Sequence, residues 1–115
     1  MSVLLVVNTP PYGSEGPYNA FRLAEALALR EEHVEVFLMG DAVQAARAGQ
    51  DPRGAHASLE LMLVGLLERA VDVHCCGACC ATRGLAEDDL IPSVRVATNH
   101  DLAAATARSD KVVSF

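Results

Sequence analysis

All four cysteines of the chain lie in one short segment, VHCCGACCATRGL, at residues 73–85. Cys75 and Cys76 are adjacent, and Cys79 and Cys80 follow after a Gly-Ala pair. Thiols at this spacing could ligate a metal, form a disulfide, provide a reactive sulfur, or fill a core as small apolar side chains. The structure expected around each cysteine separates these alternatives.

A metal site is the first alternative, because Cys76 and Cys79 have the C-x-x-C spacing of zinc ligands. A structural zinc site needs a second pair, typically roughly 12 to 20 residues away. The chain has no further cysteine and no pair of histidines at His-x₃₋₅-His spacing. We therefore expect no metal site within one subunit, and a site shared between subunits through His74 or His100 stays an open alternative. A thioredoxin-type redox pair has the same spacing, but no aromatic residue or proline flanks this motif.

Local geometry predicts different roles for the four thiols. Because successive residues of a strand point to opposite faces, Cys75 and Cys76 should not serve the same centre. We expect Cys75 to pack in the core, and also Cys80, which lies about 100° around a helix from Cys79. Cys76 ends the strand and can cap the following helix, whose N-terminus stabilises an anion. We therefore expect the pKa of Cys76 to be lowered toward neutral pH and its sulfur to be the most reactive.

Short buried strands alternate with helices along the whole chain. Continuous runs of leucine and β-branched residues predict strands, and apolar side chains at helical spacing predict helices. The expected strands are residues 3–8, 34–39, 71–75, 94–98 and 111–115, and the expected helices are residues 17–30, 41–48, 59–69, 77–83 and 99–109. Pro17 fits the first position of a helix, Asp41, Ser58 and Asn99 fit N-caps, and Gly84 fits the position after a helix C-terminus.

This alternation predicts an α/β fold with a single domain over residues 1–115. The expected architecture is a three-layer sandwich with a five-stranded, mostly parallel sheet and helices on both faces. In such a sheet the strand-to-helix loops meet at the carboxyl edge, where open α/β domains place their sites. Loops at residues 9–16, 40–41, 76–77 and 98–100 should therefore lie together, with His33 at the opposite edge. The polar stretch at residues 49–56, which includes His56, should be a separate loop.

Five residues near this edge are candidate ligand contacts beside Cys76 and Cys79. They are Tyr12, Gly13, Gly77, Arg83 and His100. Tyr12 and Gly13 belong to the first loop, which should overhang the cysteines, and His100 could donate a proton to sulfur. Structural roles compete with these: Gly13 could simply form a turn, and Arg83 could complement the helix dipole or pair with Glu87.

Composition excludes several classes of partner. The net charge is −6, with eight arginines, one lysine and no basic cluster, so we expect no nucleic-acid partner. No apolar run approaches the roughly 18 residues of a membrane span. The segment GSEG lacks the spacing of a dinucleotide-binding loop and the Walker lysine, so we expect no nucleotide cofactor. Without a basic leader at the N-terminus, we expect a cytoplasmic protein with reduced thiols.

Four segments in order resemble the DsrE/DsrF-like family, including its YchN-like branch. They are YGSEGPYNAFRLAEALA, VFLMGDAV, CGACCATRGL and DLAAATARSDKVVSF. The resemblance spans nearly the whole chain and implies a small parallel α/β sandwich that forms trimers or hexamers. In some family members, one cysteine carries persulfide sulfur, and it stands eight residues before the glycine of an Arg-Gly pair. Counting back from Gly84 reaches Cys76, so the resemblance implies that Cys76 is the sulfur carrier.

We therefore expect an intracellular sulfur carrier or sulfurtransferase-like protein that holds a persulfide on Cys76 and passes it to a partner thiol. Cys79 would share that sulfur or release it by forming a disulfide. The expected partners are sulfur donor and acceptor proteins and further copies of the chain, because the third helix is more apolar than a lone domain needs. The alternatives are a homo-oligomeric module that binds a small ligand or metal without sulfur transfer, and a structural subunit of a hetero-oligomer.

Overall fold

A five-stranded sheet forms the centre of the molecule, as a computed structural model shows for residues 1–53 and 57–115. All four strand pairings are parallel, and the strand order is β4-β3-β2-β1-β5. The predicted α/β fold is thus confirmed. The strands are β1 (Ser2–Val7), β2 (His33–Leu38), β3 (Asp72–Cys76), β4 (Arg95–Ala97) and β5 (Lys111–Ser114).

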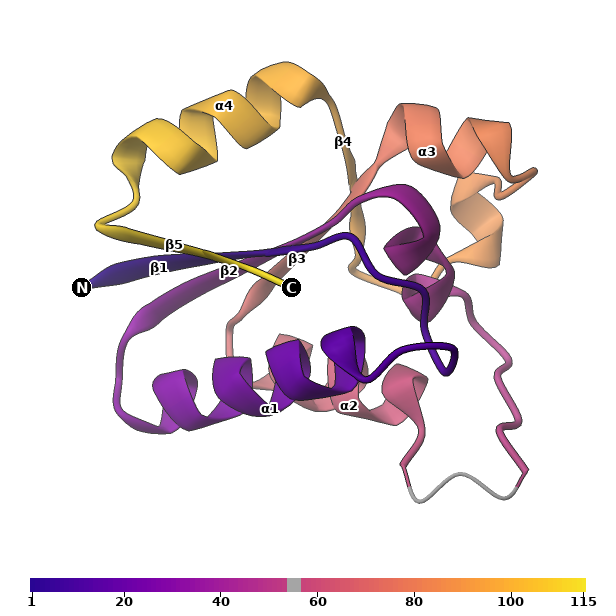
Figure 1. The fold of residues 1–115 in the computed structure, drawn as a ribbon, viewed down its shortest axis with the longest axis horizontal. Helices are drawn as coiled ribbons and strands as arrows, with labels where there is room; N and C mark the ends of the chain where they lie inside the picture. The colour runs from indigo at the N-terminus through magenta and orange to yellow at the C-terminus, as the bar shows by residue number, and fades with distance from the viewer. Residues whose placement is uncertain (54–56) are drawn as a thin grey trace.

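Helices cover both faces of the sheet, which confirms the three-layer prediction. Figure 1 shows α1 and α2 together on one face and α4 alone on the other. No helix in the described part of the chain is long and apolar enough to cross a membrane. The helices are α1 (Gly16–Leu29), α2 (Leu59–Glu68), α3 (Gly77–Thr82) and α4 (Asn99–Arg108), with two 3₁₀ helices, η1 (Gly40–Ala46) and η2 (Glu87–Asp89).

Strand alternation divides the buried side chains into two cores. Leu5, Val36 and Cys75 belong to the larger core, which α1 and α2 cover. Leu4, which precedes Leu5 in β1, and Phe37, which follows Val36 in β2, belong to a smaller core. Side chains of β4 and α4 complete this second core. Cys75 is a member of the larger core, and Cys76, at the end of β3, is partly buried and also packs against that core.

Two predicted helix caps were wrong. The Thr98 hydroxyl, not Asn99, caps α4, because it accepts the N–H of Asp101 at 3.2 Å while the Asp101 carboxylate accepts the N–H of Thr98 at 2.8 Å. The predicted helix 41–48 is the 3₁₀ helix η1, whose N-cap is Met39, and Asp41 forms no cap there.

Other boundary predictions are confirmed. Ser58 caps α2 through the N–H of Leu61. Gly84 follows the last turn of α3 with a φ of 69°, a left-handed conformation that glycine adopts without strain. The predicted loop at residues 49–56 lies only in part within the described residues, since 54–56, including His56, fall outside them.

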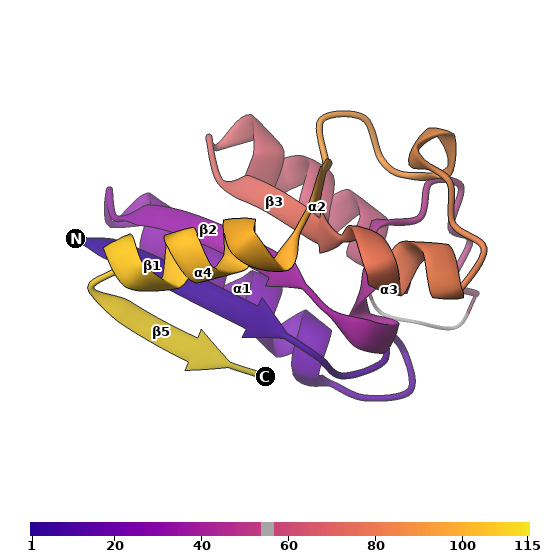
Figure 2. The ribbon, with the colours of Figure 1, turned by 90° about the horizontal axis from the view of Figure 1, so that it is seen from above.

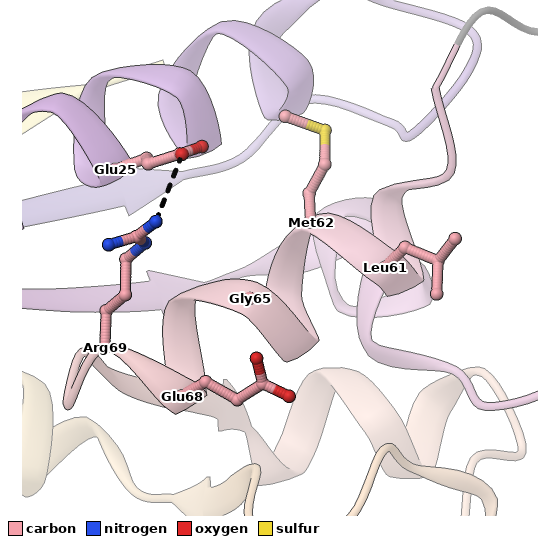
Figure 3. A pocket seen from close by; sticks show the side chains of 6 residues that line it. All are labelled: Glu25, Leu61, Met62, Gly65, Glu68 and Arg69. Atoms are coloured by element: carbon pink, nitrogen blue, oxygen red, sulfur yellow. Dashed lines mark ion pairs between the residues drawn. The ribbon is translucent and has the colours of Figure 1, made fainter.

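A hollow of about 380 Å³ lies along the outer surface of α2, and none of its lining residues is a cysteine. Figure 3 shows the Arg69 guanidinium reaching Glu25 of α1, at 3.9 Å. Leu61 beside it is 70% exposed. This face of the helix layer therefore presents apolar surface to solvent.

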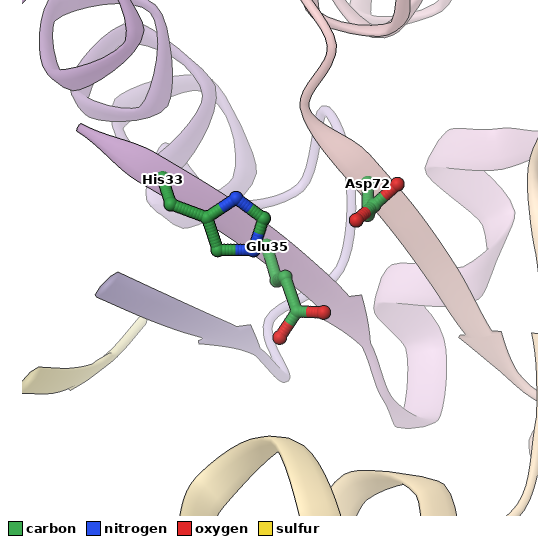
Figure 4. A group of neighbouring side chains, drawn as sticks. All are labelled: His33, Glu35 and Asp72. Carbon is green, nitrogen blue, oxygen red and sulfur yellow. The ribbon is translucent and has the colours of Figure 1, made fainter. Parts of the chain in front are cut away.

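A charged cluster lies at the start of β2 and β3, on the face that α4 covers. Glu35 is only 5% exposed, and Arg108 at the end of α4 donates a hydrogen bond to its carboxylate. His33 and Asp72 lie beside Glu35 in Figure 4, and Asp72 has its own guanidinium partner at 3.8 Å in Arg95. Both carboxylates are paired with arginines: the Arg108–Glu35 pair anchors α4 to β2, and the Arg95–Asp72 pair connects β4 to β3.

We predict that Arg108→Met lowers the free energy of unfolding by about 2 kcal/mol, because the buried Glu35 carboxylate loses its charged partner. Adding Glu35→Gln to that variant should restore roughly half of the loss, since a neutral amide is less costly to bury than an unpaired carboxylate. Urea unfolding measures both changes. Arg30→Met, at an exposed position, is the control and should change stability by less than about 0.5 kcal/mol. An unchanged midpoint for Arg108→Met would contradict a stabilising role for this pair.

Candidate functional site

The turn from β3 into α3 places Cys76 at the carboxyl edge of the sheet. Cys76 is the last residue of β3 and the N-cap of α3, and its Sγ accepts the N–H of Cys79 at 3.3 Å. Figure 2 shows α3 on the side toward which the strand arrows point. A Cβ at Gly77 would lie 3.0 Å from Cγ1 of Val96 and 3.4 Å from the carbonyl oxygen of Ala97. Glycine at this position therefore lets the start of α3 approach β4 closely.

The four free thiols divide into a buried pair and a partly exposed pair. Cys75 is fully buried and Cys80 is 3% exposed, so the prediction that both pack in the core is confirmed. Burial, and the neighbouring Cys80 thiol, raise the pKa of Cys75, and burial also raises the pKa of Cys80. Both thiols therefore stay protonated at neutral pH, which leaves Cys76 and Cys79 as the available sulfurs.

The expectation of a lowered pKa at Cys76 was wrong. Burial and the adjacent Cys79 thiol raise the pKa of Cys76, and the N–H groups of Cys79 and Ala78 oppose that shift without cancelling it. The short α3 supplies hydrogen bonds to the sulfur, but the surrounding side chains remove water that would solvate a thiolate. At neutral pH the resting form of Cys76 is therefore the thiol.

The loop after β2 holds Cys79 from the other side. The N–H of Gly40 points at Sγ of Cys79 with a distance of 3.2 Å. Arg83 donates to the Cys79 carbonyl oxygen at 3.1 Å, as expected for a cation at a helix C-terminus. The acidic partner of Arg83 is Asp41, whose Oδ1 accepts a hydrogen bond from Nε of Arg83 at 2.9 Å, and not Glu87 as the sequence suggested. These bonds connect the first turn of η1 to α3 and fix the position of the second thiol.

A cavity of about 310 Å³ opens beside Cys76. Of the seven site residues that the sequence predicted, Cys76 and Gly77 line it. Apolar side chains supply most of the remaining wall, from β2, α3 and β4: Phe37, Met39, Ala78, Val96 and Ala97. Thr98 and Asn99, at the start of α4, complete it. The sequence placed the loop at residues 98–100 at this edge, but it did not identify the apolar wall residues from β2 and β4, because their proximity depends on β2, β3 and β4 lying next to one another.

Tyr12, Gly13 and His100 are placed elsewhere. The Tyr12 hydroxyl donates to Oε1 of Gln50 at 2.6 Å and accepts the N–H of Leu59 at 3.0 Å, so it connects the first loop to the start of α2. Tyr12 lines a separate hollow with residues 50–53. A Cβ at Gly13 would make only ordinary contact with Pro10. His100 is exposed in the first turn of α4, one residue beyond the cavity wall.

A different set of side chains has the spacing of metal ligands. Within the described residues, His33, Glu35 and Asp72 are the group of three ligand atoms that lie within 4.8 Å of one another, and no cysteine belongs to it. The cysteine site offers instead one capped thiol with a second thiol beside it, an arrangement suited to sulfur exchange.

Comparisons with known proteins agree with this fold. A model of the DsrE/DsrF-like family matches residues 1–115. An uncharacterized protein of Methanocaldococcus jannaschii is 39% identical over 115 residues, which cover both chains completely. Protein YchN of Escherichia coli is 39% identical over 115 residues, covering 98% of this chain and 97% of its own length.

Solved structures confirm the architecture. The crystal structure of the E. coli ychN protein matches with a TM-score of 0.94 and 38% identity, covering 100% of this chain and 99% of the other. A protein of unknown function from Methanobacterium thermoautotrophicum shares the fold, with a TM-score of 0.78 at 15% identity over 99% of this chain and 98% of the other. The match of the family model over the whole chain, together with these relatives, shows that the chain belongs to the DsrE/DsrF-like family.

Proposed function

We propose that this protein carries sulfane sulfur as a persulfide on Cys76 and passes it to the thiol of a partner protein. Membership of the DsrE/DsrF-like family suggests a role related to sulfur relay. The observation that carries the proposal is the position of Cys76: its sulfur caps α3, borders a cavity, and lies beside a second partly exposed thiol.

The proposed transfer exchanges one sulfur–sulfur bond for another and leaves the protein's net oxidation state unchanged. In loading, the Cys76 thiolate attacks the outer sulfur of a donor R–S–SH, the donor S–S bond breaks, and RS⁻ leaves. The product is Cys76–S–SH. In delivery, an acceptor thiolate attacks the outer sulfur and Cys76 leaves as a thiolate, which the N–H of Cys79 stabilises.

Cys79 provides a second route by which the sulfur can leave the Cys76 persulfide. Its thiolate can attack the inner sulfur of Cys76–S–SH, which breaks the persulfide bond and releases HS⁻. The product is a Cys76–Cys79 disulfide, so the two cysteines supply the two electrons that reduce the sulfane sulfur. An external dithiol must then reduce the disulfide before another cycle.

The proposal includes assembly and location. We propose that the chain forms a homo-oligomer, a trimer or hexamer, and that it exchanges sulfur with donor and acceptor proteins in the cytoplasm. Exposed apolar side chains support assembly: Leu61 on α2 is 70% exposed, and Val112 on β5 is 47% exposed. A reducing cytoplasm would keep the four thiols free, as the carrier role requires.

Cys76→Ser should abolish persulfide formation. After incubation with an alkyl hydropersulfide, intact-mass spectrometry should show the gain of one sulfur atom in the native protein and no gain in the variant. Cys80→Ala is the matched control, because this thiol is buried in the core, and it should load like the native protein. Equal loading of native protein and Cys76→Ser would refute the assignment.

Reactivity of Cys76 should increase with pH. Because its pKa is raised, the thiolate fraction near neutral pH is small and should grow by about tenfold per pH unit below that pKa. Iodoacetamide labelling followed by peptide mapping measures the rate at Cys76. A labelling rate that levels off near pH 7 would indicate a lowered pKa and contradict the structure.

Cys79→Ser should stop sulfide release and prolong the life of the persulfide. Native protein loaded with sulfur should release about one sulfide per chain and lose the two accessible thiols together, because the disulfide forms in the same step. The variant should keep the added sulfur until an acceptor thiol is supplied. Sulfide release at the native rate from Cys79→Ser would exclude Cys79 as the resolving thiol.

A further inference from the structure

We infer that a small hydropersulfide with an uncharged, apolar substituent loads Cys76 directly, beside any donor protein, and that oxyanion donors such as thiosulfate load it poorly. The inference rests on the proposed function, because it names the donor class for the same thiol. It depends on the composition of the cavity beside Cys76 and on the position of the nearest charged groups.

The cavity wall is apolar where a donor would approach the sulfur. Phe37 and Met39 come from β2 and its end, and Val96 and Ala97 come from β4. The volume of about 310 Å³ is at the lower end of the range of small-molecule sites. A small hydrocarbon substituent would fit this space and gain free energy by leaving water.

The polar side chains of the wall carry no positive charge that could pair with an anion. Thr98 donates both its N–H, at 2.8 Å, and its hydroxyl, at 3.1 Å, to the carboxylate of Asp101. Hydrogen bonds from Thr98 lower the pKa of Asp101, so this carboxylate is ionised at neutral pH. The amide of Asn99 is the other polar side chain of the wall, and it carries no charge.

Two arginines close in sequence to the cavity residues, Arg83 and Arg95, are paired with carboxylates. Arg83 binds Asp41 and the carbonyl oxygen of Cys79, on the side of α3 where η1 packs. Arg95 lines a neighbouring hollow and lies 3.8 Å from Asp72. None of the residues that line the cavity, all of them in the described part of the chain, is a cation. A thiosulfate dianion would therefore lose hydration without gaining a charged partner.

The chemistry of the two donors agrees with this difference. A hydropersulfide accepts a thiolate in its protonated, uncharged form, so R–S–SH and Cys76–S⁻ give Cys76–S–SH and RS⁻. Thiosulfate reacts as a dianion, and its reaction with Cys76–S⁻ gives Cys76–S–S⁻ and sulfite. The second reaction brings like charges together in a partly desolvated site, where repulsion is stronger than in water.

The first test compares a neutral and an anionic reagent of nearly the same shape, iodoacetamide and iodoacetate. Each labelling rate at Cys76 is divided by the rate for N-acetylcysteine at the same pH and ionic strength. We expect the normalised rate for iodoacetamide to exceed that for iodoacetate by about tenfold or more. Equal normalised rates would overturn the inference, and this readout does not depend on sulfur transfer.

The second test uses Val96→Lys, which adds a cation at the cavity, with Val112→Lys as control. Val96 is 43% exposed and Val112 47% exposed, and Val112 lies on β5 at the far edge of the sheet. Val96→Lys should raise the normalised rates for iodoacetate and thiosulfate several-fold and lower that for an alkyl hydropersulfide, while Val112→Lys should change none of them. No increase with the anions in Val96→Lys would count against the inference.

Loading of Cys76 by the two donors distinguishes the proposed donor class from the proposed carrier function. Loading of native Cys76 by tert-butyl hydropersulfide at a higher normalised rate than by thiosulfate supports both. Loading by thiosulfate at an equal or higher normalised rate overturns the donor class and leaves the carrier function standing. Failure of both donors to add sulfur to Cys76 refutes the carrier function, and the donor assignment falls with it.

Discussion

The close packing of the first turn of α3 against β4 is the constraint on which the site depends. A Cβ at Gly77 would lie 3.0 Å from Cγ1 of Val96, so a larger residue would require the Val96 side chain to shift by a few tenths of an ångström. Within this first turn the N–H of Cys79 reaches the sulfur of Cys76, and mainly apolar side chains line the adjoining cavity. A wider turn would give Cys76 more solvent and fewer oriented donors.

Two opposing effects set the reactivity of the exposed thiol pair. Oriented N–H groups favour a thiolate at Cys76, while burial and the second thiol disfavour it, and the second influence prevails. A thiol that rests protonated reacts slowly with general oxidants, since thiolate character governs oxidation. In the proposed transfer, negative charge at this sulfur would form mainly during exchange with a donor or acceptor. The N–H of Gly40 and the Arg83–Asp41 pair hold the neighbouring thiol in place for that step.

Helix α4 contributes to the cavity at one end and to the stability of the fold at the other. At its N-terminus, Thr98 and Asn99 form part of the cavity wall, and at its C-terminus Arg108 binds the buried Glu35. The two ends of the sheet are thus chemically different. The carboxyl edge has free thiols in an apolar setting, while the amino edge concentrates carboxylates, arginines and His74, whose pKa is lowered by burial. The residues that line the cavity beside Cys76 carry no charge, and the Arg83–Asp41 ion pair at this edge lies where η1 packs against α3.

The sequence by itself determined what depends on local patterning. Apolar runs and helical spacing predicted the order of strands and helices, and the strand period of two separated the buried Cys75 from the capping Cys76. The tertiary structure alone decided which side chains meet. The pairing of Arg83 with Asp41, the N–H of Gly40 at Cys79, and the cavity wall from β2 and β4 all join segments far apart in the chain. The tertiary structure also decided the pKa of Cys76. This pKa depends on how much water the surrounding side chains exclude from the sulfur, and no local sequence pattern encodes that exclusion.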